Sequence, residues 1–219
     1  MNTLIDLLML ALATAVINNL LLVRFVGNCP FIGVSRRLDT AFGMGASVTF
    51  VMALSGSVTW AISYFALLPT SPLVTWINHA AGAASGKPVV PDLLFLQGII
   101  FIFVIAGMVQ IVEMYLRKFS PALYKALGVF LPLITTNCAI LFACVIIAAE
   151  PKLTGSFPHA LVYSVFGGLG FTLAILIMAG IREGLEHADV PAPLRGAPLT
   201  LITAGLMTLA FMGFKGMAE

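Results

Sequence analysis

Two short stretches contain the residues best suited to redox or metal chemistry. One holds Asn28-Cys29-Pro30 and the other holds Asn137-Cys138, and each lies inside a long apolar run. Thiolates are soft ligands that select iron-sulfur clusters, zinc or copper(I). Because tetrahedral zinc sites and iron-sulfur clusters normally take four protein ligands, two cysteines are too few. The shortfall predicts a partner chain that supplies two more.

The third cysteine has a different sequence context. Cys144 lies in a regular apolar stretch with no helix breaker beside it, which predicts a small buried hydrophobic side chain. Gly27 and Pro30 flank Cys29, and a proline also precedes Cys138. These residues interrupt helices. A disulfide between Cys29 and Cys138 is the alternative, but thiols buried in a bilayer are poorly placed for disulfide exchange.

The composition predicts the class of protein that must position these residues. The chain of 219 residues is 60% hydrophobic and 9% charged, whereas soluble domains average about 25% charged residues. We therefore predict an all-α integral membrane protein with a single transmembrane domain over 1–219. The net charge of +2 without a basic cluster gives no indication of nucleic-acid binding. Six runs are each about long enough to cross roughly 30 Å of hydrocarbon: Leu7–Val23, Thr40–Leu68, Leu93–Val112, Ala126–Ala149, Leu153–Ile181 and Gly196–Phe214.

The first run is too long for one straight helix. Only Arg24 interrupts the apolar sequence between Asp6 and Arg36, and a helix of that length would reach roughly 44 Å. The neighbourhood of Cys29 is the predicted place for a break. In a membrane such a break is tolerated only where protein buries it or it lines a polar cavity. The alternative is a helix that ends at Arg24 and leaves Cys29 in an interfacial loop.

The spacing of the cysteines indicates an internal repeat. Cys138 lies near the centre of the fourth run, and the offset of 109 residues between Cys29 and Cys138 also carries 41–68 onto 150–177. We predict a 3+3 inverted repeat, with repeats at about 1–118 and 119–219. Its first and fourth helices are interrupted near mid-membrane, where such breaks form shared sites. Glycines at 167, 168, 170, 180 and 184 predict close helix packing.

The basic residues predict the orientation of the chain. Seven of them fall in the first, third and fifth connections, and only three fall on the other side. Under the positive-inside rule this puts both termini outside the cytoplasm. The seven are Arg36, Arg37, Arg117, Lys118, Lys125, Arg182 and Arg195, against Lys87, Lys152 and Lys215.

Three long motifs carry a resemblance to a known family. The chain is similar to the family that contains the A subunit of the Rnf electron-transport complex and the D and E subunits of the sodium-translocating NADH:quinone reductase. The resemblance covers nearly the whole chain, and the loop Thr70–Pro91 is longer than is usual in the family. The motifs are the run Asn19–Phe31, the run Leu127–Ala139, and Ala188–Gly196 with Leu201–Met207.

The resemblance implies a subunit of an ion-translocating ferredoxin:NAD oxidoreductase in the bacterial inner membrane, with both termini periplasmic. It implies pairing with a homologous sister subunit of the E type and opposite orientation, beside the other Rnf subunits. The pair would share an iron-sulfur centre, [2Fe-2S] or a single iron, with Cys29 and Cys138 as two of its four ligands. That centre would relay electrons between flavin on one face and a cytoplasmic cluster subunit on the other. Sodium or protons remain alternative coupling ions, and no covalent flavin is expected on this chain.

Three further residues are candidates for positions around the centre. Arg24, about one and a half helical turns before Cys29 if that segment is helical, would compensate the negative charge of four thiolates. Its alternative role is to extend its charge to the lipid headgroups. Asn28 and Asn137 would donate hydrogen bonds to sulfur and tune the reduction potential, or would satisfy unwound backbone.

Two other function classes compete with electron relay. A secondary transporter shares inverted repeats and broken helices, but such proteins normally carry intramembrane acids, and no carboxylate lies clearly inside a run. A structural membrane anchor with an interfacial zinc site of four cysteines needs the same thiols as the relay. Metal identity therefore separates the anchor from the relay.

Overall fold

The structure is a computed structural model that describes residues 2–67, 94–119, 133–134, 137–186, 189, 191 and 195–216. Every regular element in these ranges is a helix, as the composition predicts. Lys87, Lys125, Pro132 and the long loop Thr70–Pro91 lie outside the described residues. So does most of the part of the fourth run that precedes Cys138.

The described helices follow the apolar runs of the sequence. Leu38–Phe65 and Phe157–Glu186 are long and apolar enough to cross a membrane by themselves, and four shorter apolar helices fall in the other four runs. The six spans and the 3+3 repeat themselves stay a prediction. The elements are α1 (Asn2–Leu12), the π-helical turn η1 (Ala13–Ile17), α2 (Asn28–Val34), α3 (Leu38–Ile62), the π-helical turn η2 (Ser63–Leu67), α5 (Leu94–Phe119), α8 (Cys138–Ala149), α9 (Pro151–Thr154), α10 (Phe157–Glu186) and α11 (Ala197–Gly216).

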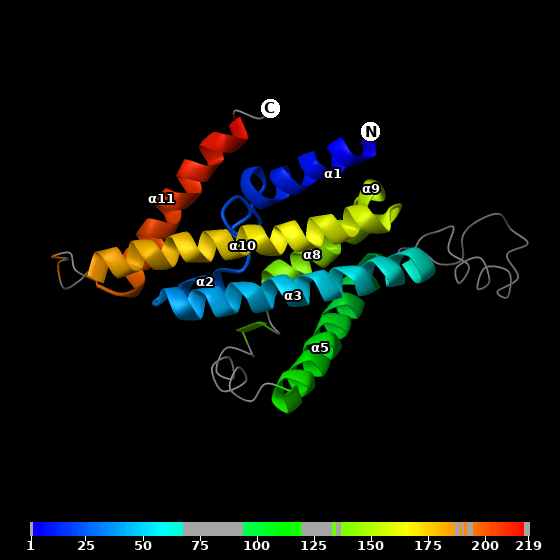
Figure 1. The fold of residues 1–219 in the computed structure, drawn as a ribbon, viewed down its shortest axis with the longest axis horizontal. Coiled ribbons are helices and arrows are strands. Elements are labelled where there is room, and N and C mark those ends of the chain that lie inside the picture. The colour runs from blue at the N-terminus through cyan, green and yellow to red at the C-terminus, as the bar shows by residue number, and fades with distance from the viewer. Residues whose placement is uncertain are drawn as a thin grey trace, which may run out of the picture.

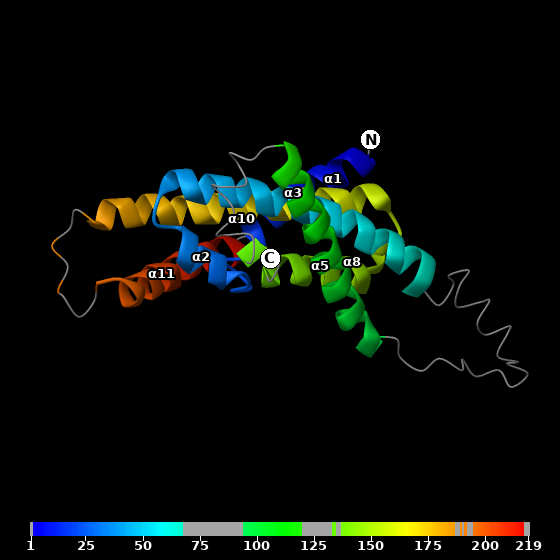
Figure 2. The same ribbon diagram turned by 90° about the horizontal axis from the view of Figure 1, so that it is seen from below.

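Helices α3 and α10 form the antiparallel centre of the molecule. They lie side by side in both views, with α1 and α11 on one side of the pair in Figure 1 and α5 on the other (Figures 1 and 2). Small residues bring their backbones together: a methyl group on Gly168 would lie 2.6 Å from the Cα atom of Thr49. Such close approach is how membrane helices associate without a hydrophobic driving force.

The glycine prediction is confirmed at three positions and wrong at two. Gly167, Gly168 and Gly170 each lie against atoms of another element, whereas a methyl group on Gly180 or Gly184 would meet nothing within 4 Å. The first three lie in the part of α10 that packs against the unwound first segment and α3. Among these five glycines, close approach to another element is therefore limited to those in the middle of α10.

The core lies where α8 packs against α3 and α10. Its buried side chains include Met44 and Met52 of α3, Phe171 and Ile175 of α10, and Cys144 of α8, which is 0% exposed. The prediction of a buried Cys144 is confirmed. Ser55 and Thr59 of α3 lie beside its thiol, so the site is less apolar than the neighbouring sequence indicates.

The first apolar segment is broken, as predicted, but the break is longer than expected. The helix ends in the π-helical turn at Ile17, the chain is non-helical from Asn18 to Gly27, and α2 begins at Asn28. Pro30, which we expected to take part in the break, lies inside α2. The alternative of a helix that continues to Arg24 and leaves Cys29 in a loop is wrong.

Candidate metal centre

The two Asn-Cys stretches lie against one another in the fold. Gly27 precedes α2 with a left-handed φ of 91°, and a methyl group on it would lie 3.0 Å from Ala139 Cβ and 3.1 Å from Asn137 Oδ1. Glycine at this left-handed position therefore allows the start of α2 to lie against the start of α8. Cys29 is the second residue of α2, and Cys138 is the first of α8. The fold thus brings two distant cysteines to adjoining helix ends.

Both cysteines present their side chains at the surface of the chain. Cys29 and Cys138 are exposed, whereas Cys144 is buried, and none of the three forms a disulfide. The disulfide that the sequence left as an alternative is absent. Among the described residues no three His, Cys, Asp or Glu side chains gather to hold a metal. The two thiols therefore lie on an outer face of the chain. Their role as metal ligands stays a prediction.

Asn137 has one satisfied and one unsatisfied polar atom. Its Oδ1 accepts a hydrogen bond of 3.0 Å from the Ala139 backbone N–H and so caps α8. Its Nδ2 is buried and has no hydrogen-bond partner. Burying an amide without a partner is costly, and this one belongs to the residue next to Cys138. The orphaned amide and the two thiols fit an anionic sulfur-rich group at this surface.

Asn28 has the backbone role that the sequence left open. Its Nδ2 donates to the Phe25 carbonyl oxygen at 3.1 Å. Phe25 has a φ of 56°, the one positive value at a non-glycine residue in the described chain. Two left-handed residues, Phe25 and Gly27, therefore lie within the turn that leads into α2, and the Asn28 amide stabilises that turn.

Arg24 lies in the non-helical link, so the helical spacing to Cys29 that we considered does not apply. Its Cζ atom is 5.7 Å from the centre of the Phe142 ring, a cation–π distance. Phe142 lies one helical turn after Cys138 on α8 and on the same face of that helix. Arg24 also lines a pocket of about 660 Å³ with Asp6 and Glu150. Its role beside the sulfur atoms stays a prediction.

Asn19 is a positioning residue that the sequence reasoning missed. It is 0% exposed, and its Nδ2 donates to the carbonyl oxygens of Ala15 at 3.1 Å and Gly170 at 2.7 Å. Its Oδ1 accepts from the backbone N–H groups of Leu21 at 3.0 Å and Leu22 at 3.4 Å. One side chain therefore satisfies unwound backbone and ties it to α10. The available signal was a polar residue in the middle of an apolar run.

The chain is similar to known proteins over nearly its whole length. Residues 7–218 match the family described as "Rnf-Nqr subunit, membrane protein". The chain is 46% identical over 212 residues to the A subunit of the ion-translocating oxidoreductase complex of Syntrophotalea carbinolica, covering 97% of each chain. It is 45% identical over 214 residues to the same subunit from Citrobacter koseri, covering 98% of each. It is 44% identical over 212 residues to that of an Azoarcus species, covering 97% of each.

Proposed function

The chain belongs to the Rnf-Nqr family of membrane proteins, and on this premise we propose that it relays electrons through an iron-sulfur centre shared with a homologous sister subunit. It is a subunit of an ion-translocating oxidoreductase complex and works as an enzyme only within that complex. The finer proposal is a ferredoxin:NAD oxidoreductase that couples electron transfer to sodium or proton transport. The proposed location is the bacterial inner membrane.

The exposed pair of thiols is the observation that carries the relay proposal. Cys29 and Cys138 come from distant parts of the sequence, yet they start adjoining helices and both face outward. Cys144, by contrast, is buried in the core. A half-site at a surface is useful only when another chain completes it. A sister subunit that contributes two thiols gives the four ligands that iron-sulfur centres normally take.

The residues around the thiols suit a group of negative charge. Cys29 and Cys138 would hold the metal centre. When bound, that centre would supply a site within the membrane where an electron can reside. The unpartnered Asn137 Nδ2 can donate a hydrogen bond to sulfur and favour the reduced state. Arg24, held over Phe142 one turn further along α8, contributes positive charge on the same helix face. Gly27 and Asn19 fix the backbone that carries Cys29.

The contact between α3 and α10 supports an inverted repeat, but in a register other than the 109-residue offset between the cysteines. Gly45 and Thr49 correspond to Gly168 and Thr172, an offset of 123 residues. Each helix carries a Gly-x-x-x-Thr motif, and the contacts are reciprocal: a methyl group on Gly45 would meet Thr172, and one on Gly168 would meet Thr49. Each threonine Oγ1 lies 2.9 Å from the carbonyl oxygen of the glycine in its own motif. The two Oγ1 atoms lie 3.1 Å apart. Reciprocal contacts between antiparallel helices are those that a local two-fold axis produces.

Serine substitution of each cysteine in the assembled complex tests the relay. We expect Cys29→Ser and Cys138→Ser each to remove the iron of the shared centre and to stop electron transfer, because serine is not a soft ligand. Cys144→Ser is the matched control and should retain both. Iron content, the paramagnetic signal of the reduced complex and ferredoxin:NAD activity are the measurements. Stoichiometric zinc without a redox signal would indicate the structural anchor instead, and equal losses in all three variants would contradict the assignment of the ligands.

A further inference from the structure

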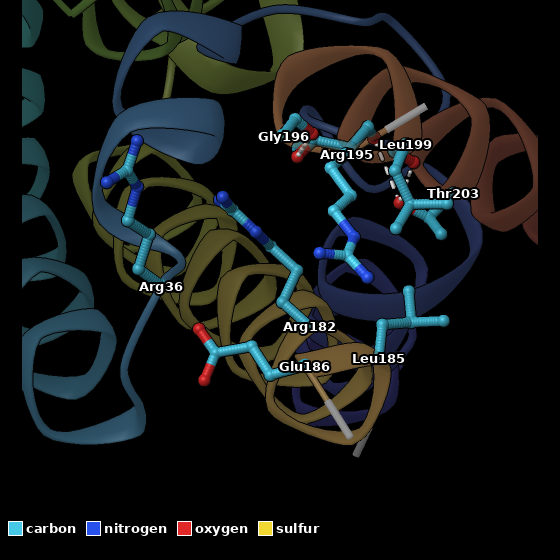
Figure 3. A pocket seen from close by; sticks show the side chains of 9 residues that line it. Arg36, Arg182, Leu185, Glu186, Arg195, Gly196, Leu199 and Thr203 are labelled. Carbon is cyan, nitrogen blue, oxygen red and sulfur yellow. Dashed lines mark hydrogen bonds between the residues drawn. The ribbon is translucent and has the colours of Figure 1, made fainter. Parts of the chain in front are cut away.

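A second polar site lies at one end of the α3–α10 pair, beside the C-terminal end of α2. A pocket of about 430 Å³ opens where the last turn of α10 meets the turn before α11 and the link between α2 and α3. Arg36, Arg182 and Arg195 line it, and Figure 3 shows their three guanidinium groups around the same opening. Glu186 is the one carboxylate among the lining residues that the structure describes. The pocket therefore has an excess of positive charge contributed by three separate elements.

Arg182 is held in place by the fold. Its Nη1 donates to the Ile32 carbonyl oxygen and to Ser35 Oγ, both at 2.9 Å. A guanidinium group has five N–H donors, and these two contacts leave those on Nε and Nη2 unused. Beside it, Glu183 Oε1 accepts from the Leu38 backbone N–H at 3.0 Å and fixes the start of α3. The central charge of the pocket is therefore preorganised before any ligand binds.

The geometry and charge select the chemistry of the ligand. Planar guanidinium groups bind phosphate with paired hydrogen bonds and resist deprotonation, so they suit phosphate recognition better than lysine does. A volume of about 430 Å³ admits a phosphate group with part of a headgroup attached. Three guanidinium groups against one carboxylate exclude a metal cation as the natural occupant. A phosphate monoester or diester satisfies both the shape and the charge.

We propose that this pocket binds the phosphate group of an anionic phospholipid, such as phosphatidylglycerol. Helix α11 begins beside the pocket and carries exposed apolar side chains that can contact acyl chains, among them Leu201, Ile202, Leu206 and Leu209. The pocket also lies at the end of the molecule where Arg36, Arg37, Arg182 and Arg195 gather, the end that the sequence assigns to the cytoplasm. Basic pockets between membrane helices on that side bind anionic headgroups.

Lipid binding to the purified, delipidated complex tests the proposal. Phosphatidylglycerol or phosphatidylcholine is added in detergent, and the lipid that remains bound is counted by native mass spectrometry. We expect a preference for phosphatidylglycerol and a loss of its affinity of roughly tenfold in Arg36→Gln and in Arg195→Gln, the size of one charged hydrogen bond. Arg37→Gln is the matched control: Arg37 is exposed and adjacent to Arg36 but does not line the pocket.

A second arm identifies the source of the phosphate. Inorganic phosphate is added to the same complex before the lipid. If it binds in an Arg36-dependent way without any lipid preference, the pocket takes soluble phosphate compounds, and the phosphate assignment holds. The proposal would be overturned if the Arg36→Gln and Arg195→Gln variants bound phosphatidylglycerol and inorganic phosphate with the same affinity as the unsubstituted complex. Both arginines are exposed, so their glutamine variants are expected to assemble.

Discussion

At the scale of single residues, Cys29 and Cys138 lie at the surface of the chain and Cys144 lies in the core. The sequence separates them in the same way, because Cys29 and Cys138 each follow an asparagine near helix breakers, whereas Cys144 lies in a regular apolar stretch. The two asparagines were harder to predict. Asn28 donates a hydrogen bond to a backbone carbonyl. Asn137 accepts a hydrogen bond from the backbone with its Oδ1 atom, but its Nδ2 atom has no partner. No sequence pattern distinguishes these roles.

Substitutions of Asn137 separate its capping role from its effect on the metal centre. Asn137→Ala removes the cap and should lower the free energy of unfolding by about 1 kcal/mol, whereas Asn137→Ser keeps a capping oxygen and most of that stability. Both variants lose the amide donor beside Cys138. We therefore expect both to lower the reduction potential of the centre by a similar amount.

Thermal melting of the purified complex and a redox titration of its paramagnetic signal measure the two effects. A potential that follows stability, falling in Asn137→Ala and unchanged in Asn137→Ser, would show that the amide has no influence on the centre. Arg24→Gln provides a comparison for charge, because it leaves the cap of α8 intact.

At the scale of elements, composition identified the helices but could not show how the first of them is interrupted. Proline and glycine near Cys29 indicated a break, and the structure has one, yet the unwound stretch begins at Asn18 and is held by the buried side chain of Asn19. The physical reason is long-range: Asn19 finds a partner in Gly170, and that contact depends on tertiary packing. The same limit applies to the glycines of α10, where identical residue types have close neighbours at Gly168 and none at Gly180.

Gly27→Ala tests the junction between α2 and α8. Alanine at a φ of 91° costs about 1–2 kcal/mol, and its methyl group would press on Ala139 and Asn137. We expect less of the complex to assemble and the assembled fraction to lose iron, since Cys29 follows two residues later.

Gly33→Ala is the matched control for this variant. Gly33 lies in α2, is exposed, and has nothing within 4 Å of an added methyl group, so alanine should leave stability unchanged or raise it by about 0.5–1 kcal/mol. Melting temperature and iron per complex are measured for both variants. If Gly27→Ala and Gly33→Ala had equal melting temperatures and equal iron contents, the contact between α2 and α8 would not determine metal retention.

At the scale of the whole molecule, the two ends of the α3–α10 pair differ in chemistry. Arg36 and Arg182 lie at one end. Trp60 lies at the other, stacked on Tyr64 at 5.3 Å and in edge contact with Phe157 at 5.0 Å. Aromatic side chains of this kind gather at membrane surfaces, and arginine accumulates on the cytoplasmic side. The sequence showed the count of basic residues on each side, but only the fold shows that Arg36, Arg182 and Arg195 border one pocket.

Fusion proteins test the orientation that these two ends predict. Figure 1 places the N-terminus near the start of α10, at the aromatic end, and α11 begins at the arginine end and runs away from it. We therefore expect alkaline phosphatase fused after residue 216 to be active, because it folds only outside the cytoplasm, and green fluorescent protein at that point to be dark. Fusion after Phe119, the end of α5, should give the reverse, since Arg117 and Lys118 lie beside it. An active phosphatase at Phe119 would invert the assignment and move the arginine pocket to the outer leaflet, where the anionic-lipid proposal would lose its electrostatic basis.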